Sequence, residues 1–355
     1  VDTVLIRIDT DHMIKVIGTF DQQISDPLRK TIMDVSSGYT DTLHAIATLD
    51  QQLAELYAEC VLSLLAQQGL KSENVQAIGC HGQTVRHKPG MKPPYTMQLG
   101  NGARLSELTG IRTINDFRQG DIAAGGQGAP LAPLFHHHLF ANRENTVIGV
   151  NLGGIANISI LRANGQIGGY DTGPANTLMD QWISFHKQLR YDEDASWARS
   201  GKLDQHLLDK LLTEPWLAQK QPKSTGPELF NLSWLDKHLT GTQIVPEDVQ
   251  YTLCEYSALT ICNEINRQAP ETSRIVMCGG GAYNPLLVER IQHYLGEREL
   301  ISSSGYGIDP EWIEASMFAW FAWRTLNNLP SNVPAVTGAA HDVVLGTIHP
   351  GNHNR

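Results

Sequence analysis

The chain has 355 residues, of which 41% are hydrophobic and 18% are charged, and its formal net charge is −10. This composition is typical of a globular protein and excludes a disordered chain, and the acidic balance argues against non-specific nucleic-acid binding. The length is enough for two domains with separate cores.

Cysteine usage and hydropathy indicate the cellular setting. The five cysteines show no C-x-x-C spacing, so we expect reduced thiols that are mostly buried. No stretch approaches 18 uninterrupted apolar residues, and no signal peptide is visible. We therefore expect a cytoplasmic protein that binds neither membranes nor nucleic acids.

The first half of the chain begins with extended segments and a long helix. Alternating apolar residues over 1–9 predict a strand, so we expect the chain to have lost a segment that came before it. A second strand is expected at 15–20. Apolar spacing over 42–68 predicts a helix that ends at Gly69. A short strand is expected at 75–80, and residues 95–134 are expected to form short elements and glycine-rich turns.

The second half alternates strands with helices. A strand is expected at 145–154 and a hairpin over 155–171, with its turn at 163–166. The clearest helix covers 249–267. A buried strand at 274–278 is followed by glycines and then by a helix. Both halves thus predict α/β domains.

Two helix starts carry capping signals. Asn284 and Pro285 fit the N-cap and first position of one helix, which Gly296 closes. Asp309 and Pro310 fit the start of another helix in the same way.

Asp171 precedes a third helix. Leu178, Met179, Trp182 and Ile183 recur at helical spacing, and Pro174 suits the first turn. This places Asp171 on a tight loop at the positive end of a helix dipole, where it either caps the helix or performs chemistry. "DTG" is also the signature of aspartic peptidases, but these need two such carboxylates and the chain has one.

Three glycine-bearing turns, at 151–157, 168–176 and 278–285, follow predicted strands. Each one can simply be a tight turn, but three together favour backbone N–H groups that bind phosphates. The chain contains neither G-x-x-x-x-G-K-[ST] nor G-x-G-x-x-G, which speaks against P-loop and Rossmann folds.

Histidines offer a weaker signal. His136, His137 and His138 are expected on a helix, where successive side chains point about 100° apart and cannot all bind one metal ion. We interpret them as ordinary helix residues. His81 and His87 flank "GQTVR" and either contact a substrate or are structural.

Seven segments, collinear over nearly the whole chain, resemble the anhydro-N-acetylmuramic acid kinases. They are IGCHGQTVRHKP, DFRQGDIAAGGQGAPLAP, NLGGIANISIL, GGYDTGPANTLMD, PKSTGPELFN, VMCGGGAYNPLL and VTGA. The resemblance implies a two-domain actin/hexokinase-like (ribonuclease H-like) α/β fold with a nucleotide cleft between the domains. We expect an N-terminal domain of residues 1–130 joined by 335–355, and a C-terminal domain of residues 131–334.

The implied activity is that of a phosphotransferase with an alcohol group as acceptor. Kinases of this family open the 1,6-anhydro ring of 1,6-anhydro-N-acetylmuramic acid with water and phosphorylate O6 with ATP. The product, N-acetylmuramic acid 6-phosphate, belongs to peptidoglycan recycling, and the family suggests a homodimer. The alternative is a nucleotide-dependent, actin-like or chaperone-like binding protein of the same fold.

The resemblance also assigns the sugar site. Asp171 is expected to be the general base that takes a proton from the attacking water, because a carboxylate is ionised at neutral pH. Thr84, Arg118 and Glu314 are expected to contact the sugar. Arg118 also suits the lactyl carboxylate or the transferring phosphate.

The nucleotide site follows from the same resemblance. The second phosphate hairpin is expected to include Gly153, Gly154 and Asn157. A separate loop on the adenosine side of the nucleotide is expected to contain Gly279, Gly280, Gly281 and Asn284. Mg²⁺ is expected to be held largely by phosphate oxygens and water, with Asp2 as the protein contact, directly or through water.

The first phosphate hairpin of the family has the form S-G-T-S-x-D-G-x-D, and only Val1 and Asp2 match its last two positions. Loss of two or three charge-assisted hydrogen bonds weakens ATP binding about a hundredfold or more. We therefore expect a polypeptide that begins at Val1 to bind the sugar but barely phosphorylate it, and restoration of the turn to recover activity.

Overall fold

The structure, a computed structural model, describes residues 1–221 and 223–352, which fall into two compact units. The first unit contains residues 1–135 and 312–352, and the second contains residues 136–311. This differs from the expected second domain of 131–334, because helix α11 (Ile313–Leu326) packs against strands of the first unit. The chain therefore returns to the first unit earlier than expected.

The first unit contains three small sheets. Strands β1 (Asp2–Ile8) and β2 (Ile14–Asp21) form an antiparallel hairpin. Strand β6 (Thr113–Asn115) lies between β3 (Ile78–Gly79), to which it is parallel, and β12 (Thr347–His349), to which it is antiparallel.

The third sheet is the antiparallel pair β4 (Gln83–Lys88) and β5 (Tyr95–Leu99). The helices of this unit, besides α11, are α1 (Asp26–Ser37), α2 (Leu43–Gln67), α3 (Gly102–Thr109), α4 (Gln119–Ala123), α5 (Ala132–Phe140, which runs into the second unit) and α12 (Pro334–Thr337).

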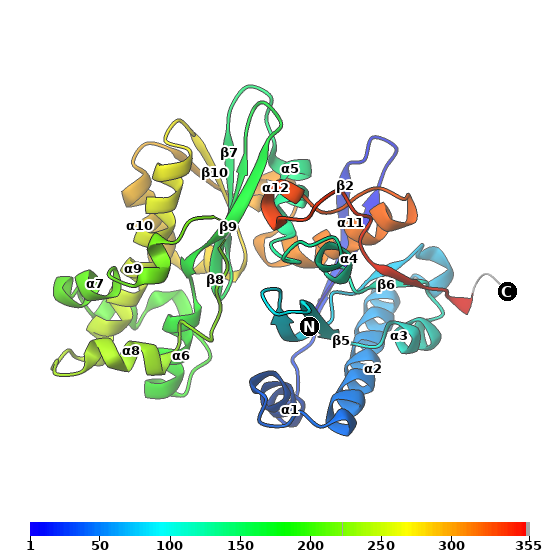
Figure 1. Ribbon diagram of the computed structural model, residues 1–355, viewed down its shortest axis with the longest axis horizontal. Coiled ribbons are helices and arrows are strands. Elements are labelled where there is room, and N and C mark those ends of the chain that lie inside the picture. Colours follow the sequence, from blue (N-terminus) through cyan, green and yellow to red (C-terminus); the bar gives the residue numbers. More distant parts are fainter. Residues whose placement is uncertain (222, 353–355) are drawn as a thin grey trace. The chain divides into compact units, whose positions relative to one another are not determined.

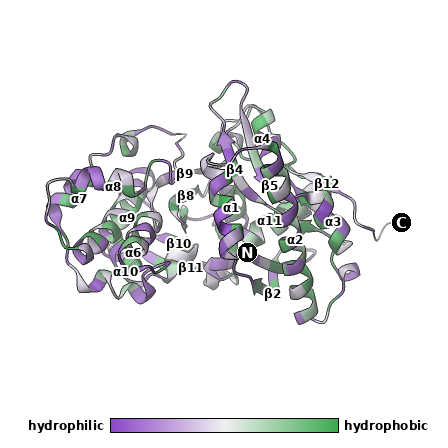
Figure 2. Cartoon of the chain, turned by 90° about the horizontal axis from the view of Figure 1, so that it is seen from below, coloured by the Kyte–Doolittle hydropathy of each residue, from purple (hydrophilic) through white to green (hydrophobic). Residues whose placement is uncertain are grey.

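The predicted long helix is confirmed as α2. Thr42 is its N-cap and accepts a hydrogen bond from the Ala45 N–H, and Gly69 follows with φ +64°. One side of α2 is buried, including Leu49, Leu53 and Leu64. Figure 2 shows hydrophobic and hydrophilic residues interspersed along this helix, as expected for a helix with one buried face.

The second unit is built on one five-stranded sheet of order β11–β10–β7–β8–β9. β10 is parallel to both β7 and β11, whereas β7, β8 and β9 are antiparallel neighbours. The strands are β7 (Val147–Leu152), β8 (Ile155–Leu161), β9 (Ile167–Pro174), β10 (Arg274–Cys278) and β11 (Glu299–Ser302).

Helices cover this sheet, and α9 is the most deeply buried of them. Its inward residues, among them Leu253, Tyr256, Ile261 and Ile265, join a single hydrophobic core with β7, β8 and β9. Figure 1 shows α9 and α10 side by side in the second unit. The helices are α6 (Thr177–Lys187), α7 (Gln205–Leu211), α8 (Leu232–Leu239), α9 (Pro246–Gln268) and α10 (Pro285–Leu295).

Short 3₁₀ segments complete the chain. They are Ser72–Asn74, Glu193–Ala195, Ala198–Ser200, Pro215–Ala218, Gly280–Tyr283, Ser303–Tyr306 and Pro310–Trp312.

Most sequence predictions for the second unit are confirmed. The hairpin appears as β8 and β9, and the helix at 249–267 appears as α9. Asn284 caps α10, with Pro285 at its first position and Gly296 at its end. The mixed α/β class is thus confirmed. All five cysteines are free and buried, as expected.

None of the helices in residues 1–221 and 223–352 combines the length and the hydropathy that a membrane span requires.

Helix α6 contains a partly buried acid, Asp180, and burial raises its pKa to about 7. Between pH 4 and pH 7 the unfolded chain has lost this proton while the folded chain retains it, so stability falls as pH rises through that window. We expect Asp180→Asn to stabilise the protein by about 1–2 kcal/mol at pH 8.

Thermal unfolding at several pH values tests this expectation. The gain should be small near pH 4, grow up to pH 7 and stay constant above it. Asp236→Asn on α8, an exposed position, is the control and should show no such gain. A gain for Asp180→Asn that does not vary with pH would contradict burial of the charge as the cause.

Candidate functional site

The three glycine-bearing turns converge in the second unit. Because β7 and β10 are parallel neighbours, their carboxyl ends meet at one edge of the sheet, and the turns at 152–154 and 279–281 follow them. Asn176 joins the third turn to the first, since its Nδ2 donates to the carbonyls of Leu152 (3.0 Å) and Gly153 (2.8 Å). The three turns therefore lie close together in the second unit.

Packing explains two glycines of the 279–281 loop. Gly279 has φ +81°, and a Cβ there would lie 2.6 Å from Asn151 Oδ1. A Cβ on Gly281 would lie 2.8 Å from the Cβ of Leu152. At both positions the fold itself requires glycine.

The fold gives no such reason for Gly280, Gly153 and Gly154. None of the three has a left-handed φ. A Cβ on Gly280 would meet nothing within 4 Å, and one on Gly154 would meet only Thr177 Cβ at 3.7 Å. Close approach of a ligand to the backbone is a physical reason for glycine at such open positions.

Alanine substitutions separate the two kinds of glycine. We expect Gly280→Ala to leave thermal unfolding unchanged but to raise the KM for ATP about tenfold, because the methyl group enters space that the ligand would occupy. Gly281→Ala should destabilise the protein by about 1–3 kcal/mol through overpacking. An unchanged KM in a folded Gly280→Ala variant would remove this loop from the nucleotide site.

Asp171 lies within β9, and not on a tight loop before a helix as expected. Pro174 is the last residue of β9, and α6 begins only at Thr177, with Asn176 as its N-cap. The strand continues because Ile155 and Ala156 pair with residues 173–174. Interpretation of Asp171 as a simple helix cap is therefore wrong.

The Asp171 carboxylate is held by a neighbouring segment of the second unit. Its Oδ2 accepts the Thr225 N–H at 2.9 Å, and its own N–H donates to the Lys223 carbonyl at 3.3 Å. Asn157 is its cross-strand partner on β8, so both side chains lie on the same face of the sheet.

Two polar atoms beside Asp171 suit a ligand. Asn157 Oδ1 and Thr225 Oγ1 are buried and form no hydrogen bond within the described residues. Buried polar groups are otherwise almost always paired, so this pair favours a polar ligand here.

In the first unit, Arg118 is fixed by two hydrogen bonds. Its Nε donates to His81 Nε2 at 3.0 Å and its Nη1 to the Gly128 carbonyl at 2.8 Å. Burial, together with the Arg118 charge, lowers the pKa of His81 to about 3. His81 is therefore neutral and serves as an acceptor that orients the guanidinium.

Glu314, at the start of α11, lies near Arg118 and Asp2. The Glu314 side chain is partly accessible to solvent, yet desolvation by the surrounding protein raises its pKa. The charge of Arg118 lowers this pKa and the charge of Asp2 raises it. Burial also raises the pKa of Asp2. Asp2, His81 and Glu314 line a cavity of about 820 Å³ within the first unit.

Thr84 lies on β4 opposite Gln98 of β5. Gln98 Nε2 donates to Thr84 Oγ1 at 3.1 Å and to Thr96 Oγ1 at 2.8 Å. Gln98 Oε1 is buried and unpaired within the described residues. Gln119, next to Arg118, donates to the Thr96 carbonyl, which ties this hairpin to the Arg118 segment.

Other predicted residues have structural partners. The Val1 ammonium group donates to the Gln22 carbonyl at 2.6 Å and lies 3.4 Å from Asp21 Oδ1. Asn284 Oδ1 accepts the N–H groups of Leu286 and Leu287, so this oxygen is occupied by capping.

The histidines also have protein partners. His136 Nδ1 lies 2.8 Å from Ser159 Oγ, and burial lowers the pKa of His136 to about 4. His87 Nδ1 lies 3.0 Å from Thr96 Oγ1. In the described part of the chain, no three His, Cys, Asp or Glu side chains are grouped to hold a metal ion.

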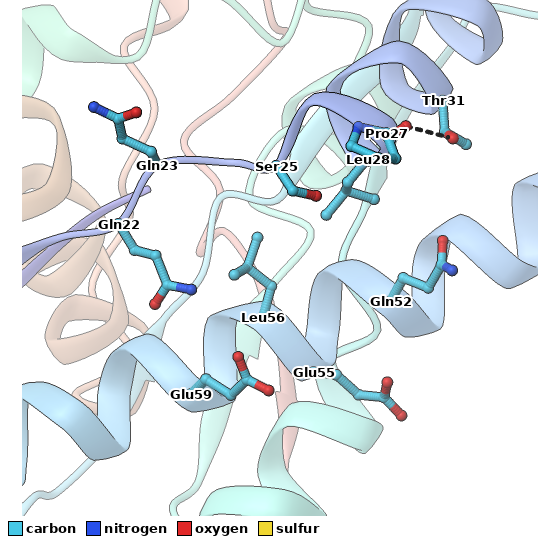
Figure 3. Close-up of a pocket in the computed structure, with 10 residues that line it drawn as sticks. All are labelled: Gln22, Gln23, Ser25, Pro27, Leu28, Thr31, Gln52, Glu55, Leu56 and Glu59. Carbon is cyan, nitrogen blue, oxygen red and sulfur yellow. Dashed lines mark hydrogen bonds between the residues drawn. The ribbon is translucent and has the colours of Figure 1, made fainter.

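A further hollow, of about 490 Å³, lies beside α1 and α2 and is lined by none of the predicted site residues. Figure 3 shows Glu55 and Glu59 on α2 and Pro27 and Leu28 on α1. Arg104 pairs with Glu55 at 3.0 Å, so part of this acidic surface is neutralised within the first unit.

Three residues at these sites, Thr225, Asn176 and Gln98, are not singled out by the sequence. Thr225 and Asn176 lie in quoted motifs, but their contacts depend on chain segments far apart in sequence. Gln98 carries no motif signal at all. For His81 the sequence predicts a substrate contact or a structural role, but it does not predict the hydrogen bond to Arg118.

Comparisons with known proteins identify the family of the chain. The family described as anhydro-N-acetylmuramic acid kinase matches residues 1–351. A relative of that name from Photobacterium profundum is 43% identical over 359 residues, covering 99% of this chain and 96% of its own. Another from Vibrio vulnificus is 44% identical over 351 residues, with 99% and 95% covered.

Solved structures show a more distant likeness. The activator of 2-hydroxyisocaproyl-CoA dehydratase from Clostridium difficile, solved with ADPNP, is 15% identical, with a TM-score of 0.42 over 76% of this chain and 82% of its own. The Acidaminococcus fermentans (R)-2-hydroxyglutaryl-CoA dehydratase component A is 11% identical, with a TM-score of 0.39 over 86% and 93%. From the match over residues 1–351 and the relatives at 43–44% identity, the chain belongs to the anhydro-N-acetylmuramic acid kinase family.

Proposed function

We propose that the protein is an ATP-dependent kinase that opens the 1,6-anhydro ring of 1,6-anhydro-N-acetylmuramic acid and phosphorylates O6. The product is N-acetylmuramic acid 6-phosphate, an intermediate of peptidoglycan recycling. Family membership supports the activity. The observation that carries the mechanism is the Asp171 carboxylate, which lies on a strand and is oriented by the Thr225 N–H instead of capping a helix.

Asp171 acts as the general base in this proposal. It takes a proton from a water molecule as the water oxygen bonds to the anomeric carbon, and the bond from that carbon to O6 breaks. O6 then forms a bond to the γ-phosphorus of ATP, and ADP leaves. Asn157, on the same face of the sheet, offers to the ligands an Oδ1 that forms no hydrogen bond within the described residues.

Thr84, Arg118 and Glu314 bind the sugar. A guanidinium held by His81 and Gly128 is pre-oriented, so less conformational freedom is lost when it binds a carboxylate or phosphate. Glu314 and Thr84 provide acceptors and a hydroxyl group for the sugar's polar groups.

The ATP phosphates are held by backbone N–H groups of Gly153, Gly154 and Gly280, where the fold alone does not require glycine. The other second-unit residues proposed to contact the nucleotide are Asn157, Gly279, Gly281 and Asn284. Mg²⁺ bound mainly by phosphate oxygens and water needs no protein cage, and the exposed Asp2 carboxylate suits one contact, direct or through water. The ion would neutralise phosphate charge. Val1 is the remaining nucleotide contact of the proposal.

Family resemblance also supports a cytoplasmic location and a homodimer. Light scattering of the purified protein measures the mass of the assembly and tests the second of these.

ATP turnover with and without the anhydro sugar tests the function. We expect ADP release only when the sugar is present, in equal amount to phosphorylated sugar. An actin-like or chaperone-like binding protein would instead hydrolyse ATP at the same rate without sugar.

A further inference from the structure

The segment that hydrogen-bonds to Asp171, residues 223–226, is irregular and is held in place by a buried side chain. Residues 223–226 form neither helix nor strand, yet their backbone makes two hydrogen bonds to Asp171, one to its carboxylate and one to its N–H. The position of the carboxylate therefore depends on whatever fixes this segment.

The Lys223 side chain is the anchor. It is 4% exposed, and its Nζ donates to Glu264 Oε1 at 3.1 Å and to the Leu217 carbonyl at 3.0 Å. The ammonium also lies over the rings of Trp216 (4.6 Å) and Tyr170 (5.7 Å). A buried ammonium is costly unless it is paired, so the ion pair strongly restrains this residue.

Glu264, on α9, binds both the residue that precedes Asp171 and the segment that hydrogen-bonds to Asp171. Its Oε2 accepts the Tyr170 hydroxyl at 2.7 Å, and Tyr170 directly precedes Asp171 on β9. One carboxylate thus fixes the residue before Asp171 and the segment that hydrogen-bonds to Asp171. Arg267 donates to the same Oε2, so Glu264 keeps a cation when Lys223 is removed.

We propose that Lys223 and Glu264 are positioning residues, whose buried ion pair holds the 223–225 segment so that the Thr225 N–H aims the Asp171 carboxylate at the attacking water. This inference rests on the proposed role of Asp171 as the base. A misplacement of about 1 Å in a reacting group can lower the rate about a hundredfold.

The same helix provides a matched control. Glu255, nine residues earlier on α9, is also buried and binds Arg290 Nε at 2.6 Å and the hydroxyl of Tyr294. This carboxylate has the same kinds of partner as Glu264, but they come from α10 and not from the Asp171 segment. Loss of either ion pair should lower stability, but only loss of the Lys223–Glu264 pair alters the Asp171 segment.

The experiment compares Lys223→Met with Arg290→Met in the full chain. Both variants should have a lower melting temperature than the wild type. Only Lys223→Met should also have a lower kcat, by roughly 10–100-fold. Its KM values for sugar and ATP should stay within about threefold of the wild type. Lys223→Arg should restore part of kcat. Equal kcat in the two Met variants would overturn the proposal.

A double-mutant cycle with Asp171→Asn separates positioning from general damage. Once the base is absent its orientation is irrelevant, so Lys223→Met should not lower the residual kcat further. A further tenfold loss would overturn the positioning role. Near-normal kcat in Asp171→Asn alone would instead overturn the proposed function. If Lys223→Met does not fold, Glu264→Gln replaces it, because this change keeps the side-chain shape. The same kcat and KM criteria then apply.

Discussion

Asp171→Asn should reduce both ring opening and phosphorylation by about 10²–10⁴-fold or more. The amide keeps the shape of the side chain and can still accept the Thr225 N–H through its oxygen. It cannot take a proton from water. Steady-state assays of ADP and of phosphorylated sugar measure the two steps together.

ATP binding should change little in this variant, because Asp171 acts on water and not on the nucleotide. Calorimetry with a non-hydrolysable ATP analogue measures this directly. Asp209→Asn, an exposed position on α7, is the matched control and should have normal kcat. Near-normal turnover in Asp171→Asn would leave the structure without a general base in the proposed position.

Arg118→Lys is expected to have the second-largest effect. Lysine keeps the positive charge but loses the planar fork and the donation from Nε to His81. Loss of one charge-assisted hydrogen bond, worth about 1.5–3 kcal/mol, corresponds to a rise in the KM for the sugar of about 10–100-fold.

Arg104→Lys, which alters an exposed arginine paired with Glu55, controls for this chemistry on the surface of the same unit. It should leave both KM values unchanged. If Arg118→Lys raises the KM for ATP but not that for the sugar, Arg118 serves the phosphate and not the sugar.

The local structure of the second unit could largely be predicted from sequence. Capping residues and apolar spacing are local signals, so α9, α10 and the β8–β9 hairpin were predicted correctly. The start of α6 was predicted wrongly, because Pro174 suits a helix start but its strand pairing with Ile155 extends β9. This pairing is a tertiary effect that propensity does not contain.

The candidate site was predictable only in part. Motifs indicated Asp171, Arg118 and the glycine turns, but not the contacts that orient them. Thr225 lies 54 positions from Asp171, and His81 lies 37 from Arg118. Such contacts depend on how distant segments fold together, and only the structure shows them.

Similarly, the second unit ends at residue 311, whereas the sequence suggests a domain that ends at residue 334. The residues around 312 carry no signal of a domain boundary, because the chain passes from the second unit to the first within a continuous helical region. Only the packing of α11 against β1 and β3 assigns it to the first unit.

The most direct test of the account is turnover in water enriched in oxygen-18, followed by mass spectrometry of the product. The proposal predicts one labelled oxygen on the anomeric carbon, unlabelled O6 and an unlabelled phosphate group, because water attacks the sugar and O6 attacks ATP. Label in the phosphate, or product in which the anhydro ring remains closed, would contradict the account.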